Sequence, residues 1–214
     1  MRENLSKYNE KELLDLCEEK LEYLRRDKEY LEEHGIKVDN LYEFESKINK
    51  FKDMPDETDL KNIILTTERN KKNVRMELVV LLRNIETKAK YAWGEYSKQL
   101  QDFQLSKINA EKDIELLLFS RAVRVSTDIH FNNLIPFGFT KTIRDRLLEK
   151  NNEFYVSLTN TKRAMKFKEA TLVKRNAISM DLVETLIKYC DIAKTSSQLH
   201  NSKHIDDYLL DNLL

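Results

Sequence analysis

The chain has 214 residues, 41% of them hydrophobic and 35% charged, and its 37 basic and 37 acidic side chains give a net charge of zero. This balance excludes a global field that would draw the protein to nucleic acid or anionic lipid. Three glycines and two prolines are too few for the many turns of a strand-rich fold, whereas long helices need few turns. The composition therefore predicts an all-α protein.

The first helix is predicted to begin at Asn9, because Asn9 and Glu12 have the spacing of a capping box. Leucines recur at helical spacing after it, with charged residues between them. Gly35 is expected to end this helix, since glycine is common just past the last helical residue. Asp39 is then expected to cap a second helix.

Pro55 is predicted to break the chain after the second helix. A third, longer helix is expected from about Leu60 to Trp93, with Gly94 closing it. A polar connector is predicted over residues 96–110.

The pattern then starts again, which predicts an internal duplication. At a constant offset, Leu31 corresponds to Leu134, Gly35 to Gly138 and Phe51 to Phe154; after a one-residue slip, Met76-Glu77-Leu78-Val79 corresponds to Met180-Asp181-Leu182-Val183. We expect the corresponding glycines at equivalent turns with positive φ, and both tetrads at equivalent core positions.

The duplication predicts two similar helical units, each with a short helix, a glycine turn and one long or broken helix. Their expected boundaries are 1–95 and 111–195, followed by a tail over 196–214 that contains a short amphipathic segment. No proline follows in the second half at the position of Pro55, so its last two helices could be one rod; the sequence leaves this open.

Two short segments carry a resemblance to a known group of proteins. Glu115-Leu116-Leu117 through Ser120-Arg121-Ala122, followed by Gly138-Phe139-Thr140, resembles an uncharacterised family of duplicated all-helical bacterial proteins with no known activity. The resemblance implies the fold and brings no activity or cofactor with it.

The histidines offer little metal chemistry in the sequence. No carboxylate stands three residues before any of them, which excludes the Glu-x-x-His pairs of di-metal bundles. His200 and His204 would share a helical face and are the weak candidates for a metal, but a polar tail favours solvated side chains. We expect no metal and no cofactor.

No motif of a known catalytic centre is present. The chain has no glycine-rich phosphate loop and no nucleophile elbow. Cys17 and Cys190 stand far apart and are expected to be small buried hydrophobes. We therefore predict no catalytic residue and no small-molecule substrate, which makes a non-enzymatic protein the expectation.

Basic residues gather in the second half of the chain. They are Lys162, Arg163, Lys166, Lys168, Lys174 and Arg175. Two interpretations compete: the cations pair with acidic helices within the bundle or a dimer, or they form a stripe that binds phosphates. We prefer the first.

Two further groups are candidates for an interaction surface. Tyr91 and Trp93 form an aromatic cluster that either packs the junction between the halves or anchors a partner. Ile205, Tyr208 and Leu209 would share one face of a short helix too small to be stable alone, so it must dock on its own bundle or on a partner.

The expected function is that of a non-catalytic interaction, adaptor or structural protein, with a protein partner or self-association. The alternative is a nucleic-acid-associated protein that uses the basic residues. The N-terminal residues lack the apolar stretch of a signal peptide, and no apolar run is long enough to span a membrane. We therefore expect the protein to be cytoplasmic.

Overall fold

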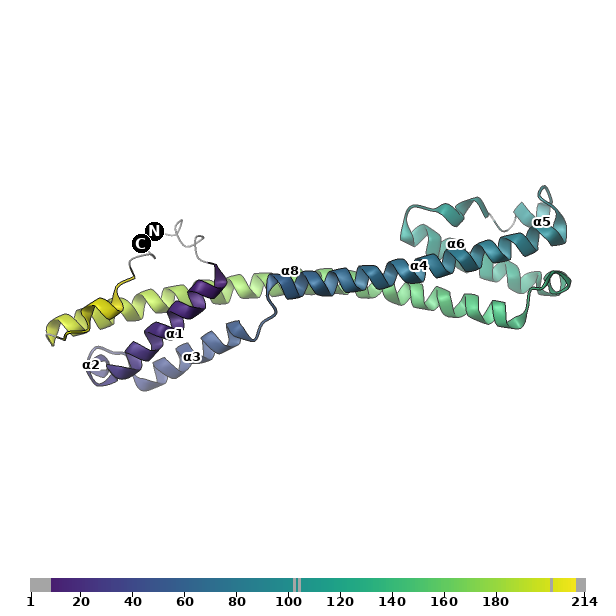
Figure 1. Ribbon diagram of the computed structural model, residues 1–214. Helices are drawn as coiled ribbons and strands as arrows, with labels where there is room; N and C mark the ends of the chain where they lie inside the picture. The colour runs from purple at the N-terminus through teal and green to yellow at the C-terminus, as the bar shows by residue number, and fades with distance from the viewer. Residues whose placement is uncertain (1–8, 102, 104, 201, 211–214) are drawn as a thin grey trace. The chain divides into compact units, whose positions relative to one another are not determined.

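The computed structural model describes residues 9–101, 103, 105–200 and 202–210, and the regular structure in these residues is entirely helical. The elements are α1 (Glu10–Arg26), α2 (Lys28–Glu33), α3 (Val38–Lys52), α4 (Glu57–Trp93), α5 (Lys98–Gln101), η2 (Leu105–Asn109), α6 (Asp113–Ile129), α7 (Phe131–Leu134), η3 (Ile135–Phe137), α8 (Lys141–Leu199) and η4 (Ile205–Tyr208) (Figure 1). The prediction of an all-α protein is confirmed. Among the described helices, none has a stretch both long and apolar enough to cross a bilayer.

The first helix begins where the sequence predicts. The Asn9 side chain accepts hydrogen bonds from the Lys11 and Glu12 backbone N–H groups at 2.9 and 3.0 Å, and the Glu12 carboxylate accepts from the Asn9 N–H at 3.2 Å. The helix does not continue to Gly35, because the chain leaves helical geometry at Asp27 and starts α2 one residue later. The predicted single helix is therefore two.

The start of α3 differs from the prediction by two residues. Lys37, not Asp39, precedes the first helical turn, and its backbone N–H donates to the Asn40 side-chain oxygen at 2.9 Å. Asp39 lies within the first turn, where a negative charge faces the positive end of the helix dipole.

The glycine turns have the backbone that the sequence predicts. Gly35, Gly94 and Gly138 have φ angles of 90°, 79° and 80°, a region in which a side chain costs about 1–2 kcal/mol. Gly35 precedes α3, Gly138 precedes α8, and Gly94 directly follows α4.

The two halves differ after these turns. The chain is broken around Pro55, between Lys52 and Glu57, as predicted. In the second half the corresponding position, Leu158, lies inside α8, whose 59 residues form one uninterrupted helix. This answers the question that the sequence leaves open.

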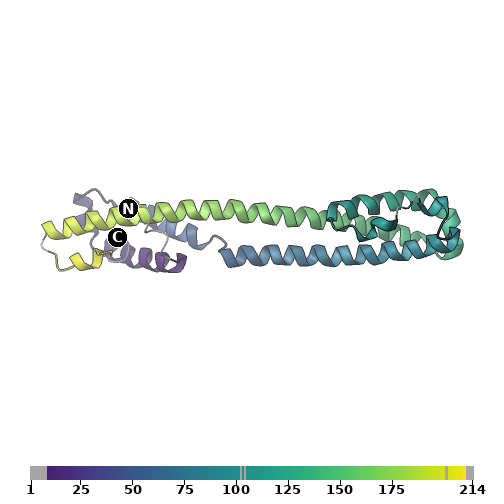
Figure 2. The same cartoon turned by 90° about the horizontal axis from the view of Figure 1, so that it is seen from above.

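The chain divides into two compact units. Of the described residues, unit 1 takes those up to Thr58 and from Glu169 onward, and unit 2 takes Asp59–Lys168. The core of unit 1 combines α1, α3 and the C-terminal part of α8 (Figure 2). Its fully buried members are Cys17, Leu24, Phe44, Phe51, Leu182, Leu186 and Ala193.

Unit 2 has a core of the same kind, built from α4, α6 and the N-terminal part of α8. The segment after α4, predicted to be a polar connector, adds Leu100, Phe103 and Ile108 to this core at 7%, 1% and 3% exposure. That part of the prediction is wrong, because Leu100 on α5, Phe103 between the two short helices and Ile108 on η2 all pack inward although polar residues separate them in the sequence.

The helices recur along the chain at one offset. Glu10, Lys28 and Val38 begin α1, α2 and α3, and Asp113, Phe131 and Lys141 begin α6, α7 and α8, each 103 positions later. Each compact unit nevertheless takes its first helices from one half of the sequence and its long helical segment from the other. The predicted units 1–95 and 111–195 therefore do not coincide with the compact units, and the duplication itself stays a prediction.

The two predicted core tetrads are only partly buried, and they differ at their last position, where Val79 is half-buried and Val183 is buried. Leu78 and Leu182 are both fully buried, each in its own unit. Met76 and Met180 are 51% and 59% exposed, so their placement in the core is wrong. A residue two positions before a buried leucine lies about 200° around the helix from it, on the solvent side.

Candidate interaction surface

Helix α6 is apolar on two opposite faces. One face packs into the core of unit 2 through Leu116, Leu117, Phe119 and Val123. The opposite face carries what we call the α6 stripe: Ile114, Leu118, Ala122, Val125 and Ile129. Its four larger side chains, all but Ala122, are 56%, 59%, 49% and 72% exposed in chain order. At 100° per residue the five positions fall within an arc of about 80°, so they form one continuous strip.

The equivalent face of α1 shows that the fold does not require this strip. At the 103-residue offset the α6 stripe corresponds to Lys11, Asp15, Glu19, Glu22 and Arg26, all of them exposed. Both helices have 17 residues and occupy the same place in their units. A charged outer face is therefore sufficient for this position, and the apolar residues of α6 need another explanation.

An open groove of about 490 Å³ runs beside the α6 stripe. It is lined by Lys107, Asn109, Ala110, Glu115, Leu118, Phe119 and Ala122. Leu118 and Ala122 belong to both the stripe and the groove, so the two features form one continuous surface. Its polar rim includes the ion pair between Lys112 and Glu115, whose charged atoms are 3.2 Å apart.

The other edge of the α6 stripe carries a different set of charges. Arg124 donates to Asp128 at 3.1 Å. The Arg121 guanidinium lies 5.3 Å from the centre of the Tyr155 ring, and within the described part of the chain it has no carboxylate at ion-pair distance. Arg121 is therefore the cation at this edge that a partner could neutralise.

Sequence reasoning missed the α6 stripe, although the signal was present. Both faces of α6 are apolar, and hydrophobic periodicity predicts one buried face without indicating that a second apolar face is exposed. Comparison of α6 with α1 at the 103-residue offset would have shown five apolar residues against five charged ones.

The predicted basic stripe is shorter than expected. Lys162, Arg163, Lys166 and Lys174 are exposed on α8, and Lys168 is half-buried. None of these five has an ion-pair partner among the described residues, so the preferred interpretation, pairing with acidic helices, receives no support at these positions.

Arg175 is not part of a surface at all. It is 4% exposed in unit 1, where its guanidinium binds the Glu10 carboxylate at 2.6 Å. It also donates to the backbone carbonyls of Phe51, Met54 and Pro55. The prediction that Arg175 belongs to an interaction surface is therefore wrong, because its position on α8 directs its side chain toward the core of unit 1.

The aromatic cluster divides between packing and exposure. The Trp93 ring lies 5.7 Å from that of Phe103 and 5.1 Å from that of His130, within unit 2. Tyr91, the other member of the predicted cluster, is 73% exposed, and the nearby Tyr96 is 93% exposed. Trp93 therefore contributes to packing, and the two tyrosines do not.

The tail docks on its own unit through Tyr208. This residue is 2% exposed, and its hydroxyl lies 2.7 Å from an Asp27 carboxylate oxygen and 3.0 Å from the Tyr23 carbonyl. Ile205 and Leu209 beside it are half-buried. Tyr208 is thus unavailable to a partner, and the amphipathic helix predicted here is the short 3-10 turn η4.

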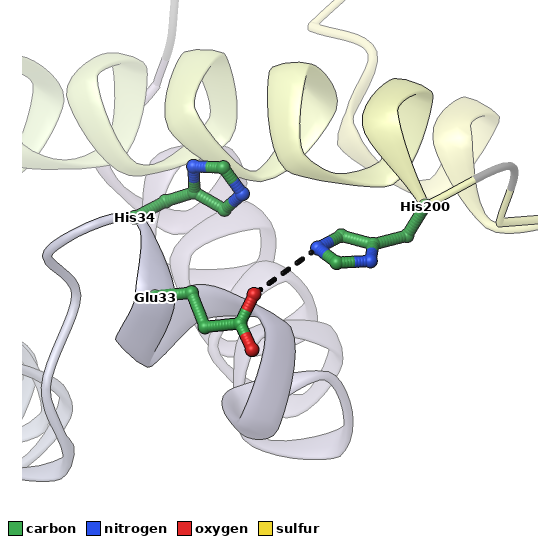
Figure 3. Close-up of side chains that lie close together, drawn as sticks. All are labelled: Glu33, His34 and His200. Carbon is green, nitrogen blue, oxygen red and sulfur yellow. Dashed lines mark ion pairs between the residues drawn. The ribbon is translucent and has the colours of Figure 1, made fainter.

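The two candidate histidines do not share a helical face, because α8 ends at Leu199. His204 pairs with Asp207 at 3.3 Å, three residues along η4. His200 instead approaches Glu33, with 3.5 Å between its Nε2 and a carboxylate oxygen, and lies near His34 (Figure 3).

The two thiols are buried in the core of unit 1 and do not form a disulfide. Burial is the largest cause that raises the pKa of both Cys17 and Cys190 to about 12. A thiol with such a pKa is a poor nucleophile at neutral pH. The arrangement is that of packed small side chains, as the sequence suggests.

Comparisons of the chain with protein-family models, with curated proteins and with solved structures give no match. The resemblance to duplicated all-helical bacterial proteins therefore stays an expectation. The case for a function rests on the chain's own geometry, and above all on the α6 stripe.

Proposed function

We propose that this chain is a non-catalytic interaction protein that binds an amphipathic helix of a partner protein on the α6 stripe. The observation that carries the proposal is the contrast between two equivalent helix faces, exposed and apolar on α6 but exposed and charged on α1. Exposed apolar strips bordered by charge are typical of protein-binding sites. The free, buried thiols fit a reducing compartment such as the cytoplasm.

A helix is the partner that fits the dimensions of the surface. From Ile114 to Ile129 the stripe is about 22 Å long at 1.5 Å per residue. A second helix can lie along it and place side chains in the adjoining groove, as helices do in helix-in-groove complexes. The stripe offers only four large apolar side chains, each about half to three-quarters exposed, whereas a standard interface buries about 800 Å² per partner. We therefore expect moderate, reversible binding.

A second copy of the chain fits less well than a different partner. Antiparallel two-fold pairing of α6 would set Ile114 opposite Ile129 and Leu118 opposite Val125. In this arrangement each edge of the helix meets the same edge of the other copy, so the two copies of Arg121, which lies midway along the stripe, come side by side. Two arginines with no carboxylate between them repel each other, which disfavours this self-association.

The charges at the edge indicate the chemistry of the partner helix. Arg121 is available to a carboxylate, and the Arg124–Asp128 pair lies one turn further along. An acidic residue beside the partner's apolar stripe would complement Arg121 and set the direction of the bound helix.

The proposal can be tested with a synthetic helix of about 20 residues. The peptide carries leucines at the spacing of the α6 stripe and glutamates along both edges of this leucine face. Fluorescence anisotropy of the labelled peptide should give micromolar binding to the full chain. Val125→Glu should weaken binding by about tenfold or more, equivalent to about 1.4 kcal/mol. The matched control is Val156→Glu, an exposed valine of the same unit at 52% exposure, which should leave binding unchanged.

Three results would overturn the proposal. The peptide could fail to bind, it could bind the Val125→Glu protein as tightly as the wild type, or a lysine-edged peptide could bind better than the glutamate-edged one. If sedimentation shows a dimer of the wild type that Val125→Glu dissociates, the partner on the α6 stripe is a second copy of the chain and not a helix of another protein. The free energy of unfolding of both valine variants should lie within about 0.5 kcal/mol of the wild-type value, because the two residues are exposed.

Nucleic-acid binding is the alternative function. Its support is the exposure of Lys162, Arg163 and Lys166 without ion-pair partners among the described residues. Tyr155 and Phe167 on the same helix are 52% and 49% exposed, but three neighbouring cations can neutralise few phosphates, which makes a weak site. Submicromolar, steeply salt-dependent binding of a labelled oligonucleotide, lost in Lys162→Glu with Lys166→Glu, would favour this function over the proposed one.

A further inference from the structure

Three side chains able to bind a metal converge in unit 1. Glu33 and His34 lie at the end of α2, and His200 directly follows α8. Their nearest ligand atoms all lie within 4.8 Å of one another, and this is the one such group found among the residues that the structure describes. Figure 3 shows the Glu33 carboxylate directed at the His200 ring, with the His34 ring projecting toward the same space.

The distances suit a small tetrahedral ion. Zinc binds imidazole nitrogen and carboxylate oxygen at about 2.0–2.1 Å, so neighbouring ligand atoms of a tetrahedron are about 3.3 Å apart. The separation of 3.5 Å between Glu33 and His200 is close to that value. His34 has a ligand atom within 4.8 Å of those of Glu33 and His200, and all three side chains are at least partly exposed and can rotate toward an ion.

The surrounding residues hold the two segments together without metal. The Ser196 hydroxyl on α8 donates to the Tyr30 carbonyl on α2 at 3.2 Å, and the Tyr30 ring packs against His200 with 5.0 Å between ring centres. Gly35, at a φ of 90°, turns the chain directly after His34. The ligands therefore come from backbone positions that are already fixed.

The equivalent place in unit 2 shows that the fold does not need these side chains. At the 103-residue offset Glu33 and His34 correspond to Pro136 and Phe137. At the 104-residue offset of the later segment His200 corresponds to Tyr96. None of these three is a customary zinc ligand, so the ligand set is particular to unit 1.

We propose that Glu33, His34 and His200 bind one Zn²⁺ ion, with water as the fourth ligand. The ion would fasten the C-terminal end of α8 to the turn between α2 and α3. The sequence pairs His200 only with His204 and predicts no metal, because the three ligands proposed here come from opposite ends of the chain. The site is independent of the α6 stripe.

The test uses the full chain without an affinity tag, freed of metal by chelation. Calorimetric titration with zinc sulfate should give one ion per chain, and cobalt(II) should give the visible absorption of a low-coordinate site. His200→Ala and His34→Ala should each weaken zinc binding by about tenfold or more. Zinc should raise the melting temperature of the wild type but not of these variants.

His204→Ala is the matched control, because His204 lies four residues from His200 and outside the proposed ligand set. It should bind zinc like the wild type. Absence of binding, unchanged binding in His200→Ala, or loss of binding in His204→Ala would each overturn the proposal. So would a stoichiometry of one zinc per two chains with zinc-dependent dimers, since that places the ion between molecules.

Discussion

Replacement of Arg175 by alanine removes the most heavily bonded buried charge of unit 1. The guanidinium is bound by the half-exposed Glu10 carboxylate at 3.2 and 2.6 Å. It donates to the Met54 carbonyl at 2.6 Å and to those of Phe51 and Pro55 at 3.3 Å. It also lies 4.3 Å from the centre of the Phe51 ring. The arginine thus holds the end of α3 and the proline break against α8 and the start of α1.

The expected cost follows from these contacts. Hydrogen bonds from a charged donor contribute about 1.5–3 kcal/mol each when buried, but Met54 and Pro55 are half-exposed, so water recovers part of the loss. The cation–π contact adds about 0.5–2 kcal/mol. The pair with Glu10 adds up to about 1 kcal/mol, since that carboxylate is 48% exposed. After about 2 kcal/mol of arginine side-chain entropy is returned, we expect a net destabilisation of about 2–4 kcal/mol.

Urea denaturation followed by far-ultraviolet circular dichroism measures this loss. A destabilisation of this size also lowers the melting temperature by roughly 5–15 °C for a chain of this length. The neighbouring Lys174→Ala is the control, because Lys174 is exposed and should change stability by less than about 0.5 kcal/mol. A cost below about 1 kcal/mol for Arg175→Ala, or equal costs for the two variants, would refute the assignment of Arg175 as a structural clamp.

Two further predictions concern one polar group in each unit. Asn151→Ile should raise the unfolding free energy of unit 2, measured in urea, by about 1–2 kcal/mol. The Asn151 side-chain oxygen is buried without a partner, its amide makes one 3.3 Å bond to the Ser120 carbonyl, and the corresponding residue of unit 1 is the buried Ile48. A loss of stability would show that the oxygen is satisfied in solution. The pKa of Asp27 is lowered in the folded protein, and the hydrogen bond from Arg26 is the largest cause. The ionised Asp27 carboxylate therefore stabilises the fold fully above its pKa in the unfolded chain, about 3.9. This stabilisation is lost as the pH falls through the lower pKa of the folded state. Unfolding free energies measured between pH 6 and pH 2 should therefore fall less steeply for Asp27→Asn than for the wild type, and parallel curves would contradict this.

The zinc ligands show where prediction from sequence stops. Glu33, His34 and His200 are ordinary residues of two polar segments, and the only sequence neighbour that suggests a metal for His200 is His204. Their convergence requires α8 to return along α2, which is long-range packing. The burial of Arg175 is likewise not predictable, since the sequence of neighbouring basic residues does not indicate which of them faces the core.

The α6 stripe was predictable in part. Its five residues are visible as an apolar set at helical spacing, and the corresponding charged residues of α1 identify them as unnecessary for the core. What the spacing cannot state is which of the two apolar faces is buried, because both satisfy the pattern of an amphipathic helix.

The sequence by itself determined the all-α class, the capped start of α1 at Asn9, the glycine turns at Gly35 and Gly138 and the break at Pro55. These are local properties, since capping, positive φ and the missing proline N–H act within a few residues of the chain. Only the tertiary structure decided how the segments of the two halves are shared between the compact units, and which residues of each helix face a core. Those outcomes depend on the burial of apolar surface between segments far apart in the sequence, which local backbone preferences do not encode.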